Sequence, residues 1–285
     1  MAPSLPMLLW HNWQPAWPLD GMALVAAGAY LAGTARTPRW PWRRTAAFLA
    51  GLVAVLVALQ SGIGAYDDRL LSDHMVQHLL LLELAPLLLL AGRPVTLAVR
   101  GGPRGSRAAL ARRFAALSAL MRPAVCLGLF ALVVLATHIP AVYDATLTNN
   151  TLHEAEHVLY LVAGLLMWWP MLDADPDVSH RLGGLGRLIY INAAMLPMTL
   201  IGVFLYRDPS LFYPGYAAPA RALGVSAVAD QQQAGIIMWV LGSFVMVVAG
   251  LWQIMTALIA EERRMQLSER AATTAVLHAD PGRRP

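Results

Sequence analysis

Seven long apolar runs limit what this sequence can fold into. A helix that crosses the hydrocarbon core needs about 20 mostly apolar residues, and only helices or closed barrels satisfy their backbone polar groups there. The chain is 58% hydrophobic and 13% charged, whereas soluble domains carry about 25% charged residues. We therefore predict an all-α fold, a polytopic membrane helix bundle with seven transmembrane helices. The predicted spans are Leu19–Gly33, Thr45–Gly64, His74–Val99, Pro123–His138, Leu152–Leu172, Leu188–Tyr206 and Gln233–Ala260.

The predicted bundle, residues 19–260, lies between two segments of different composition. Residues 1–18 contain Trp10, Trp13 and Trp17 but no Arg or Lys. They lack the basic start of a cleaved signal peptide, so we interpret them as an interfacial segment. Residues 261–285 are polar and are predicted to form a cytoplasmic tail that begins as a short helix and then becomes disordered. No soluble domain is inserted between the spans.

The placement of arginine predicts the orientation of the bundle. All 21 basic residues are Arg and none is Lys. Eighteen of them fall in the segments after spans one, three, five and seven, and three fall in the other segments. Because basic residues accumulate on the cytoplasmic side, we predict an outer N-terminus and a cytoplasmic C-terminus. The net charge of +4 is too small and too scattered for a nucleic-acid binder, so no nucleic-acid partner is expected.

The predicted cytoplasmic stretch Arg100–Arg122 has its own pattern. Leu110, Phe114, Leu117 and Met121 recur at helical spacing with arginines around them. This pattern predicts a basic amphipathic helix that lies on anionic lipid. A docking surface for the loops of a partner is the alternative.

Two histidine pairs stand where predicted spans three and five begin. His74 and His78 form one pair, and His153 and His157 form the other. Residues four apart lie on one helix face about one turn from each other. In the predicted orientation both pairs lie at the outer face, and His138 closes span four at the same level. Because ionisable groups in a bilayer are costly and usually face a partner or a cavity, we predict one shared metal site. Interhelical hydrogen bonding is the alternative.

The ligand types favour copper. Cys126 is the only cysteine, so a Cys-x-x-Cys site is excluded. Imidazole suits copper, zinc and iron, and adding thioether while omitting thiolate shifts the preference toward copper, here Cu(I). We assign His138, Glu156 and Asp230 as ligands or as groups that fix the imidazole tautomers. Possible thioether ligands are Met195, Met198 and Met238, for which core packing is the alternative.

Two other functions are compatible with parts of the pattern. The segment His153–His157 satisfies H-E-x-x-H, the zinc-protease signature in which Glu is the general base. A second histidine pair would leave such a metal without an open position for water. A membrane cytochrome would use paired histidines as axial haem ligands. Electron transfer across a bilayer requires cofactors at two depths, and His11, His180 and His278 lie outside the spans.

Predicted span three is broken by Pro86 and Gly92. Glu83 lies deep in this span, three residues before Pro86. On a regular helix it projects about 140° away from His78, so we do not count it as a ligand. We expect it to hydrogen-bond with the backbone that Pro86 leaves unpaired.

Three groups of motifs give the sequence a family resemblance. The first is Ser72–His78 with Gly92-Arg93-Pro94; the second is Tyr143-Asp144-Ala145 with His153–His157 and Trp168-Trp169-Pro170; the third is Tyr213–Tyr216 with Asp230-Gln231-Gln232 and Ala234–Trp239. In this order, between about residues 20 and 260, they resemble the multi-pass CtaG-like cytochrome c oxidase assembly proteins. An unrelated single-span copper chaperone that shares the name uses a cysteine pair, which this chain lacks.

The resemblance implies a seven-span protein of the bacterial cytoplasmic (inner) membrane that is needed for maturation of haem–copper oxidases and helps to install copper. Its implied partners are cytochrome c oxidase subunits and membrane lipids. The family's motifs fall on His74, His78, His153, His157, Asp230, Gln231 and Gln232, with Tyr143 and Asp144 in the second group. We therefore predict an assembly factor with no catalytic residues, not an enzyme, that holds Cu(I) at the outer face and aids its delivery to an oxidase subunit.

Overall fold

The computed structural model describes residues 12–279 except 103–107, 110–111, 113–118 and 173–181, and every regular element in that part of the chain is helical. This confirms the all-α prediction for the described residues. The α-helices are α2 (Trp17–Ala35), α3 (Trp42–Gln60), α4 (Gly62–Tyr66), α5 (Leu71–Leu79), α6 (Ala85–Ala91), α7 (Pro94–Gly101), α9 (Pro123–Thr137), α10 (Pro140–Thr148), α11 (Asn150–Leu172), α12 (Gly184–Arg207), α13 (Ala217–Ala222), α14 (Ala227–Ile236) and α15 (Gly242–Ala279). Two π-helices, η1 (Leu80–Leu84) and η3 (Ile237–Leu241), and the 3₁₀ helix η2 (Pro214–Tyr216) complete them.

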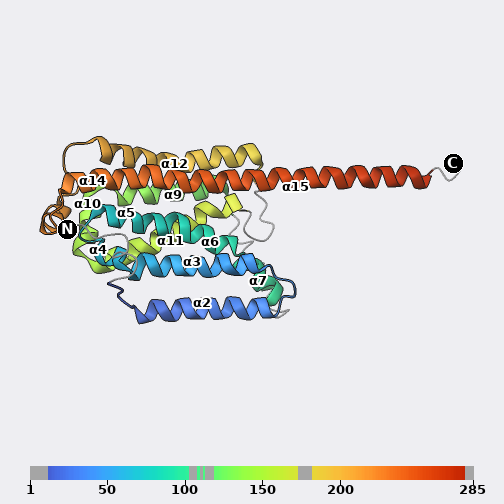
Figure 1. The fold of residues 1–285 in the computed structure, drawn as a ribbon, viewed down its shortest axis with the longest axis horizontal. Coiled ribbons are helices and arrows are strands. Elements are labelled where there is room, and N and C mark those ends of the chain that lie inside the picture. The colour runs from blue at the N-terminus through green and yellow to red at the C-terminus, as the bar shows by residue number, and fades with distance from the viewer. Residues whose placement is uncertain (1–11, 103–107, 110–111, 113–118, 173–181, 280–285) are drawn as a thin grey trace.

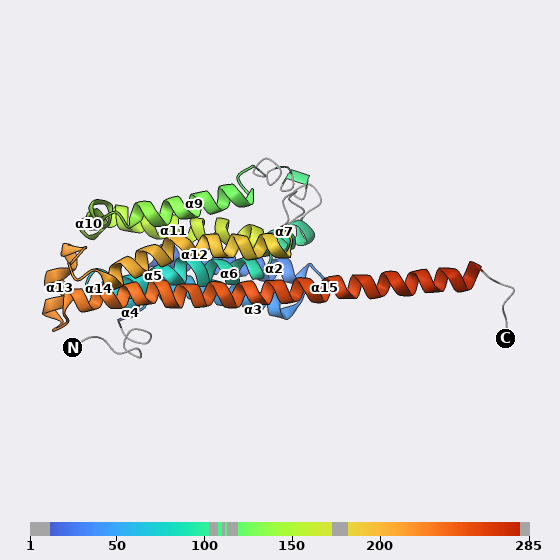
Figure 2. The same ribbon diagram turned by 90° about the horizontal axis from the view of Figure 1, so that it is seen from above.

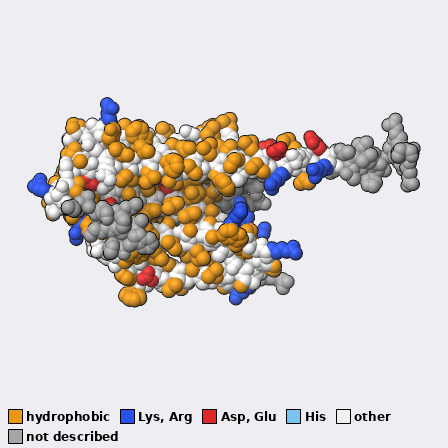
Figure 3. Space-filling view, viewed as in Figure 1, with side chains coloured by type: hydrophobic (Ala, Val, Ile, Leu, Met, Phe, Trp, Pro, Cys, Tyr) orange, Lys and Arg blue, Asp and Glu red, His pale blue; other side chains and the backbone are white. Residues whose placement is uncertain are grey.

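The long helices lie side by side along one axis, as both ribbon views show (Figures 1 and 2). Short helices α4, α10 and α13 gather at one end, where α5 and α11 begin; we call this the histidine end. The other end carries α7, and α15 projects beyond it. On the face drawn in Figure 3, hydrophobic side chains cover the flank of the bundle and arginines gather near α7, so we call this second end the arginine end.

The number of membrane crossings is lower than predicted when it is judged by length and apolar composition. Among the described residues, five helical stretches are long and apolar enough to cross a membrane: Trp42–Tyr66, Leu71–Gly101, Asn150–Leu172, Gly184–Arg207 and Ala227–Arg270. A sixth crossing results if α9 and α10 count as one span, although they are bent by 71°. The predicted first span corresponds to α2, which is not among them. This helix contains Asp20 and three glycines, which lower its hydropathy.

The predicted third span is broken where the sequence indicated. Pro86 cannot donate a backbone hydrogen bond, and the helix widens into η1 just before it. Gly92 ends α6, and Arg93 then takes a left-handed conformation with φ 52° before Pro94 starts α7. The chain therefore continues across the bundle as the consecutive helices α5, η1, α6 and α7, which together form one stretch from Leu71 to Gly101.

A close approach at Gly164 brings α11 onto this broken span. A Cβ atom at Gly164 would lie 2.2 Å from the carbonyl oxygen of Leu82 and 2.6 Å from Cγ of Pro86. No larger residue fits without moving one helix, because the first contact is with backbone. Helix α11 is therefore packed directly against η1 and α6, which continue the chain from α5 and its histidine pair.

Two predicted segments extend past the bundle. The stretch Arg100–Arg122, predicted to lie on lipid, falls largely outside the described residues. At the other predicted boundary, between residues 260 and 261, α15 continues without a break to Ala279. Figure 1 shows this part of α15 projecting from the arginine end.

Candidate metal centre

Five histidines from two helices and one helix end meet at the histidine end. His74 and His78 stand one turn apart on α5 with ring centroids 4.0 Å apart, and His153 and His157 do so on α11 at 4.4 Å. The rings of His74 and His153 are 5.3 Å apart and join the two pairs. His138, the residue after α9, has its ring centroid 6.1 Å from that of His78. The predicted ligands thus converge, and metal binding by them stays a prediction.

Two carboxylates lie among these rings. Glu156 Oε2 is 3.9 Å from His74 Nε2, and Asp67 Oδ2 is 3.7 Å from His153 Nε2. Ligand atoms of His74, His153 and Glu156 all lie within 4.8 Å of one another, and those of Asp67, His153 and His157 do so as well. A single ion could therefore be held by either set after small side-chain shifts, and His153 belongs to both.

Hydrogen bonds determine the tautomers of His74 and His138. Nδ1 of His74 is 3.3 Å from the carbonyl oxygen of Asp67 and 3.1 Å from the Tyr216 hydroxyl, which itself donates to that carbonyl at 2.7 Å. Nδ1 of His138 is 2.7 Å from the carbonyl oxygen of Val134. A carbonyl oxygen can only accept, so both Nδ1 atoms carry the proton. Each Nε2 atom therefore keeps a free lone pair, which is the form that binds a metal.

His157 is held in the opposite tautomer. The Gln77 amide nitrogen donates to the Ala58 carbonyl at 3.0 Å and to Asp67 Oδ2 at 2.9 Å, which fixes the orientation of the amide. Its oxygen then accepts from His157 Nε2 at 2.9 Å. His157 therefore offers Nδ1, and Gln77 links α5, α11 and the loop that carries Asp67.

Several ligand atoms are buried and have no hydrogen-bond partner among the described residues. They are His74 Nε2, both ring nitrogens of His78, His138 Nε2, His153 Nε2 and Glu156 Oε2. Buried polar atoms in folded proteins nearly always have a partner, and each unpaired one costs about 1–3 kcal/mol. Such a concentration of unpaired potential ligand atoms fits a bound metal ion.

Tyrosines close the site around the histidines. The Tyr160 ring lies 4.1 Å from that of His78, and the Tyr143 ring lies 5.0 Å from that of His74. Tyr216 and Tyr213 approach from the loop before α13, and burial raises the pKa of both above the usual value, so their hydroxyls stay neutral donors. Burial also raises the pKa of Asp67 to about 7, against the opposing effect of the Gln77 hydrogen bond.

The histidine pairs and the Asp-Gln-Gln motif lie together at the histidine end, and a family profile matches the sequence that carries them. The profile of the cytochrome c oxidase caa3 assembly factor (Caa3_CtaG) family matches residues 28–258. The chain belongs to this family. The resemblance drawn from the motifs is therefore confirmed, and the family's general role is cytochrome c oxidase assembly.

Curated relatives of this Caa3_CtaG protein are longer than the chain. Uncharacterised proteins of Mycobacterium bovis and Mycobacterium tuberculosis are each 29% identical over 285 residues, which covers 93% of this chain and 42% of theirs. One of Mycobacterium leprae is 29% identical over 245 residues, covering 78% of this chain and 36% of its own. The chain thus spans less than half the length of these relatives. No solved structure matches it significantly.

The Asp-Gln-Gln motif of the Caa3_CtaG chain lies beside the histidines but makes structural hydrogen bonds. Asp230 accepts from the Leu71 backbone N–H at 2.7 Å and from the Ser72 hydroxyl at 2.5 Å, so it caps α5. Gln231 accepts from the Phe212 backbone N–H at 2.7 Å and donates to the Ser210 carbonyl at 2.9 Å. Gln232 is half-buried. The first two residues place α5 and the loop before α13 around the site.

The other predicted residues lie at different distances from the rings. Oδ1 of Asp144 is buried against Gly215, in the turn that supplies Tyr216. Met198 and Met238 are buried and Met195 is half-buried. The Met198 methyl group lies against Gly242, where α12 meets α15, whereas the histidines lie on α5, on α11 and at the end of α9. A thioether contribution therefore stays a prediction.

Glu83 does not make the expected hydrogen bond. Neither of its carboxyl oxygens has a partner among the described residues, and its side chain is fully buried in η1 beside Gly242. The expectation assumed that Pro86 would leave a carbonyl oxygen unpaired. The backbone accommodates Pro86 by forming the π-helix η1 in the preceding turn, so its hydrogen-bond pattern changes before Pro86 is reached.

Sequence reasoning missed Asp67, Gln77 and Tyr160. Asp67 precedes α5 in the short connection between predicted spans two and three, to which no site residue was assigned. Gln77 was quoted within the first motif without a role, although a third polar residue between two paired histidines was a usable signal. Tyr160 follows His157 by three residues, so it lies on the same face of α11.

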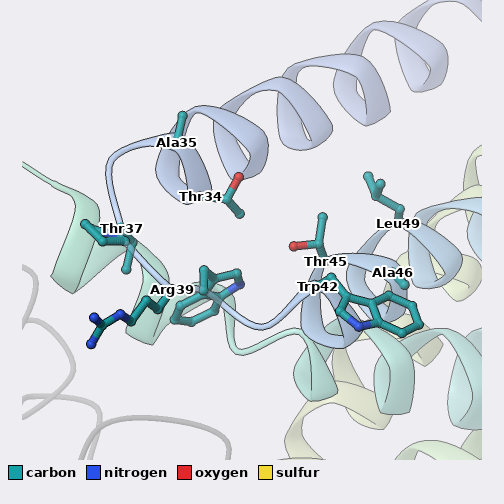
Figure 4. A pocket seen from close by; sticks show the side chains of 10 residues that line it. Thr34, Ala35, Thr37, Arg39, Trp42, Thr45, Ala46 and Leu49 are labelled. Atoms are coloured by element: carbon teal, nitrogen blue, oxygen red, sulfur yellow. The ribbon is translucent and has the colours of Figure 1, made fainter.

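A separate cavity of about 610 Å³ lies at the arginine end, between α2, α3 and their connection (Figure 4). Thr34, Arg39, Trp42 and Leu49 are among its lining residues, and none of the lining residues is His, Cys, Asp or Glu. It offers no metal ligands of these types and lies at the opposite end of the bundle from the histidines.

Proposed function

We propose that this protein binds copper as Cu(I) in the histidine cluster and delivers it to a cytochrome c oxidase subunit. The observation that supports this most is the set of buried Nε2 atoms on His74, His78, His138 and His153 that have no hydrogen-bond partner among the described residues. Two of these imidazoles are held by hydrogen bonds in the metal-binding tautomer before any ion arrives. Family membership supplies the context, because the family's members are cytochrome c oxidase caa3 assembly factors.

Ligand chemistry supports copper over the harder cations. Several imidazole nitrogens and only two nearby carboxylates suit copper, zinc or iron more than magnesium or calcium, which prefer oxygen. The site is closed by tyrosine rings and is almost dry: His74 is 0% exposed and His78 is 2% exposed. A monovalent ion needs less charge compensation than a divalent one in such surroundings. The role is cargo handling, so we propose no catalysed reaction.

We propose that α2 is the seventh crossing, with the histidine end outside and the arginine end in the cytoplasm of a bacterial inner membrane. Two side-chain hydrogen bonds help to attach α2 to the bundle. Gln60 Nε2 donates to Asp20 Oδ1 at 2.9 Å, and the Tyr30 hydroxyl donates to the Gly92 carbonyl at 2.6 Å. The arginine distribution supports the orientation. A reporter fused after Arg284 that is active only in the periplasm should be inactive, and activity there would refute this topology.

Two alternative functions have less support. A haem group would need a macrocycle between its axial histidines, but His78 is packed against the His74 ring at 4.0 Å and the Tyr160 ring at 4.1 Å. A zinc protease would need the second residue of H-E-x-x-H as general base. That residue, Glu154, is exposed on α11, and the buried carboxylate is Glu156.

Metal analysis of the purified full chain tests the proposal. Protein supplied with Cu(I) in detergent under reducing conditions should retain copper, measured by mass spectrometry, without a Soret band in its optical spectrum. His74→Ala should lose the copper, whereas His278→Ala, in the projecting part of α15, should keep it. Copper absent from the parent protein, or retained equally in both variants, would refute the function. A Soret band would favour haem.

A further inference from the structure

Four histidines, His153, His74, His78 and His138, form a row that leads from the solvent-exposed surface to the lipid-facing side of the bundle. We call this row the histidine file. Successive ring centroids are 5.3 Å apart from His153 to His74, 4.0 Å from His74 to His78 and 6.1 Å from His78 to His138. We infer that Cu(I) enters at His153 and leaves at His138, where an oxidase membrane segment takes it through a pocket between α9 and α12. This inference rests on the proposed copper function and adds a direction and an exit.

The entrance is defined by exposure and charge. The side chain of His153 is 16% exposed, whereas those of His74 and Glu156 are 0% and 3% exposed. Asp68 and Glu154 are both exposed, and their charges act on His153 from the outer surface. Acidic groups at the opening of a closed site raise the local concentration of cations. Water-borne copper therefore meets His153 first, together with Asp67.

The exit is defined by a second pocket. A cavity of about 340 Å³ lies between α9, α12 and the loop before η2, and His138 is among its lining residues. Its other walls include Leu135, Leu200 and Phe204, which are 49%, 65% and 44% exposed on the flank of the bundle. Side chains of this kind on the flank of a membrane bundle face lipid. A ligand that reaches His138 through this pocket therefore comes from within the bilayer.

His138 is set apart from the resident ligand groups. It belongs to neither of the two sets whose ligand atoms lie within 4.8 Å of one another. Its Nδ1 is held by the Val134 carbonyl at 2.7 Å, and its Nε2 is buried without a partner among the described residues. It is thus oriented for a metal yet distant from the main cluster, as a transfer ligand requires. The bend of 71° between α9 and α10 places it where the span is broken.

Transfer along the file is ligand exchange. A bond between copper and the next imidazole nitrogen forms as the bond to the previous ligand breaks, and copper stays Cu(I). No electron moves and no oxidant is required. At the exit, a donor side chain of the oxidase segment forms the new bond as the bond to His138 Nε2 breaks. Because the walls are apolar, that donor must be carried by a membrane-spanning segment.

Two chelators of the same chemistry separate the two ends. Full-length protein in lipid nanodiscs is loaded with Cu(I), and copper is extracted either by sulfonated bathocuproine, which stays in water, or by unsulfonated bathocuproine, which partitions into lipid. Leu200→Trp places a large ring at the pocket, and Leu196→Trp is the matched control. Leu196 is one turn away on α12, is 59% exposed and does not line the pocket.

We expect Leu200→Trp to load copper normally and to slow extraction into lipid by roughly tenfold, the effect of a barrier about 1.4 kcal/mol higher, with extraction into water unchanged. Leu196→Trp should leave both rates unchanged. His138→Ala should slow the lipid route similarly and lower copper loading less than His74→Ala does.

Equal effects on both routes, no effect on either, or loss of loading in His138→Ala as large as in His74→Ala would overturn the inference. A parent protein that binds no Cu(I) would instead refute the proposed function, so the two failures are distinguishable.

Discussion

Two polar regions lie next to each other at the histidine end, and they differ in how their hydrogen bonds are satisfied. At the junction of α14 with α5, Asp230 and Gln231 use their oxygens and the amide nitrogen on backbone groups and on Ser72. In the histidine cluster, the ring atoms that face one another have no partners among the described residues. Both regions are buried and both belong to the family motifs. We call the first region, Asp230 and Gln231, the frame, because its hydrogen bonds hold α5 and the loop before α13 in place. The second region has the properties of a binding site.

The two regions therefore also differ in what their polar groups contribute to the stability of the protein. Satisfied hydrogen bonds contribute about 0.5–1.5 kcal/mol each to stability, whereas each unpaired buried group costs about 1–3 kcal/mol. A cluster of unpaired imidazoles is therefore a net cost to the metal-free protein. Substitutions in the histidine cluster should change copper affinity, whereas substitutions of Asp230 or Gln231 should change stability. The predictions below test this difference from the largest expected effect to the smallest.

The largest effect is expected when two histidines of the cluster are removed. His78→Ala and His157→Ala should each weaken Cu(I) binding by more than the roughly 10–100-fold that loss of a supporting group costs. The double variant should lose little more than the worse single variant, because the residues act as one unit. A double-mutant cycle on copper affinity and on melting of the metal-free protein measures this. Additive losses of stability with unchanged copper affinity would show that the histidines only hold the helices together.

A smaller effect is expected when a supporting hydrogen bond is removed. Tyr216→Phe deletes the hydroxyl that contacts His74 Nδ1 and the Asp67 carbonyl. Copper affinity should fall by roughly 10-fold, the lower end of the range for such groups, while stoichiometry stays the same. Competition with a Cu(I) chelator measures it. Tyr66→Phe is the control, since Tyr66 lies outside this contact network, and an equal loss there would contradict the assignment.

The frame should respond in stability and not in affinity. Asp230→Ala removes the cap of α5 and should lower the free energy of unfolding by about 1–2 kcal/mol, with copper affinity of the folded fraction unchanged. Thermal melting in detergent, without metal, provides the measurement. Asp208→Ala is the control, because Asp208 is half-buried and its carboxylate accepts hydrogen bonds from the nearby loop residue Ser210, away from α5. A loss of affinity without a loss of stability would move Asp230 into the binding site.

The smallest effect is expected at the second residue of H-E-x-x-H. Glu154 is exposed and belongs to neither set of converging ligand atoms, so Glu154→Gln should leave copper stoichiometry and oxidase maturation nearly unchanged. Copper content of the protein and oxidase activity in membranes from the same cells provide the measurements. Lost maturation with normal copper content would support a hydrolytic role for Glu154.

The features that follow from helical periodicity were predicted best from the sequence. Four-residue spacing put His74 beside His78 and His153 beside His157, because residues one turn apart on a helix are neighbours in any tertiary context. The break at Gly92-Arg93-Pro94 followed from the same local reasoning. The structure supports five or six crossings among the described residues, whereas the sequence predicted seven. The difference arises because α2 is only marginally apolar and because α9 and α10 are sharply bent.

Local reasoning failed where the outcome depended on contacts between distant segments. Asp230 was predicted to be a ligand or a group that supports the imidazoles, and only the packing of α14 on α5 shows that its carboxylate caps the start of α5. Glu83 was assigned a backbone partner that the π-helix η1 removed.

The sequence by itself determined the helical class, the family, the histidine pairs and the end of the bundle at which they stand, because each follows from composition or from spacing along one helix. The tertiary structure decided which polar groups saturate one another and which remain free. That outcome depends on Gly164, which lets α11 approach Leu82, and on Gln77 and Tyr216, which fix imidazole tautomers across three segments. Hydrogen-bond partners far apart in sequence are chosen by packing, and no periodicity within one helix encodes that choice.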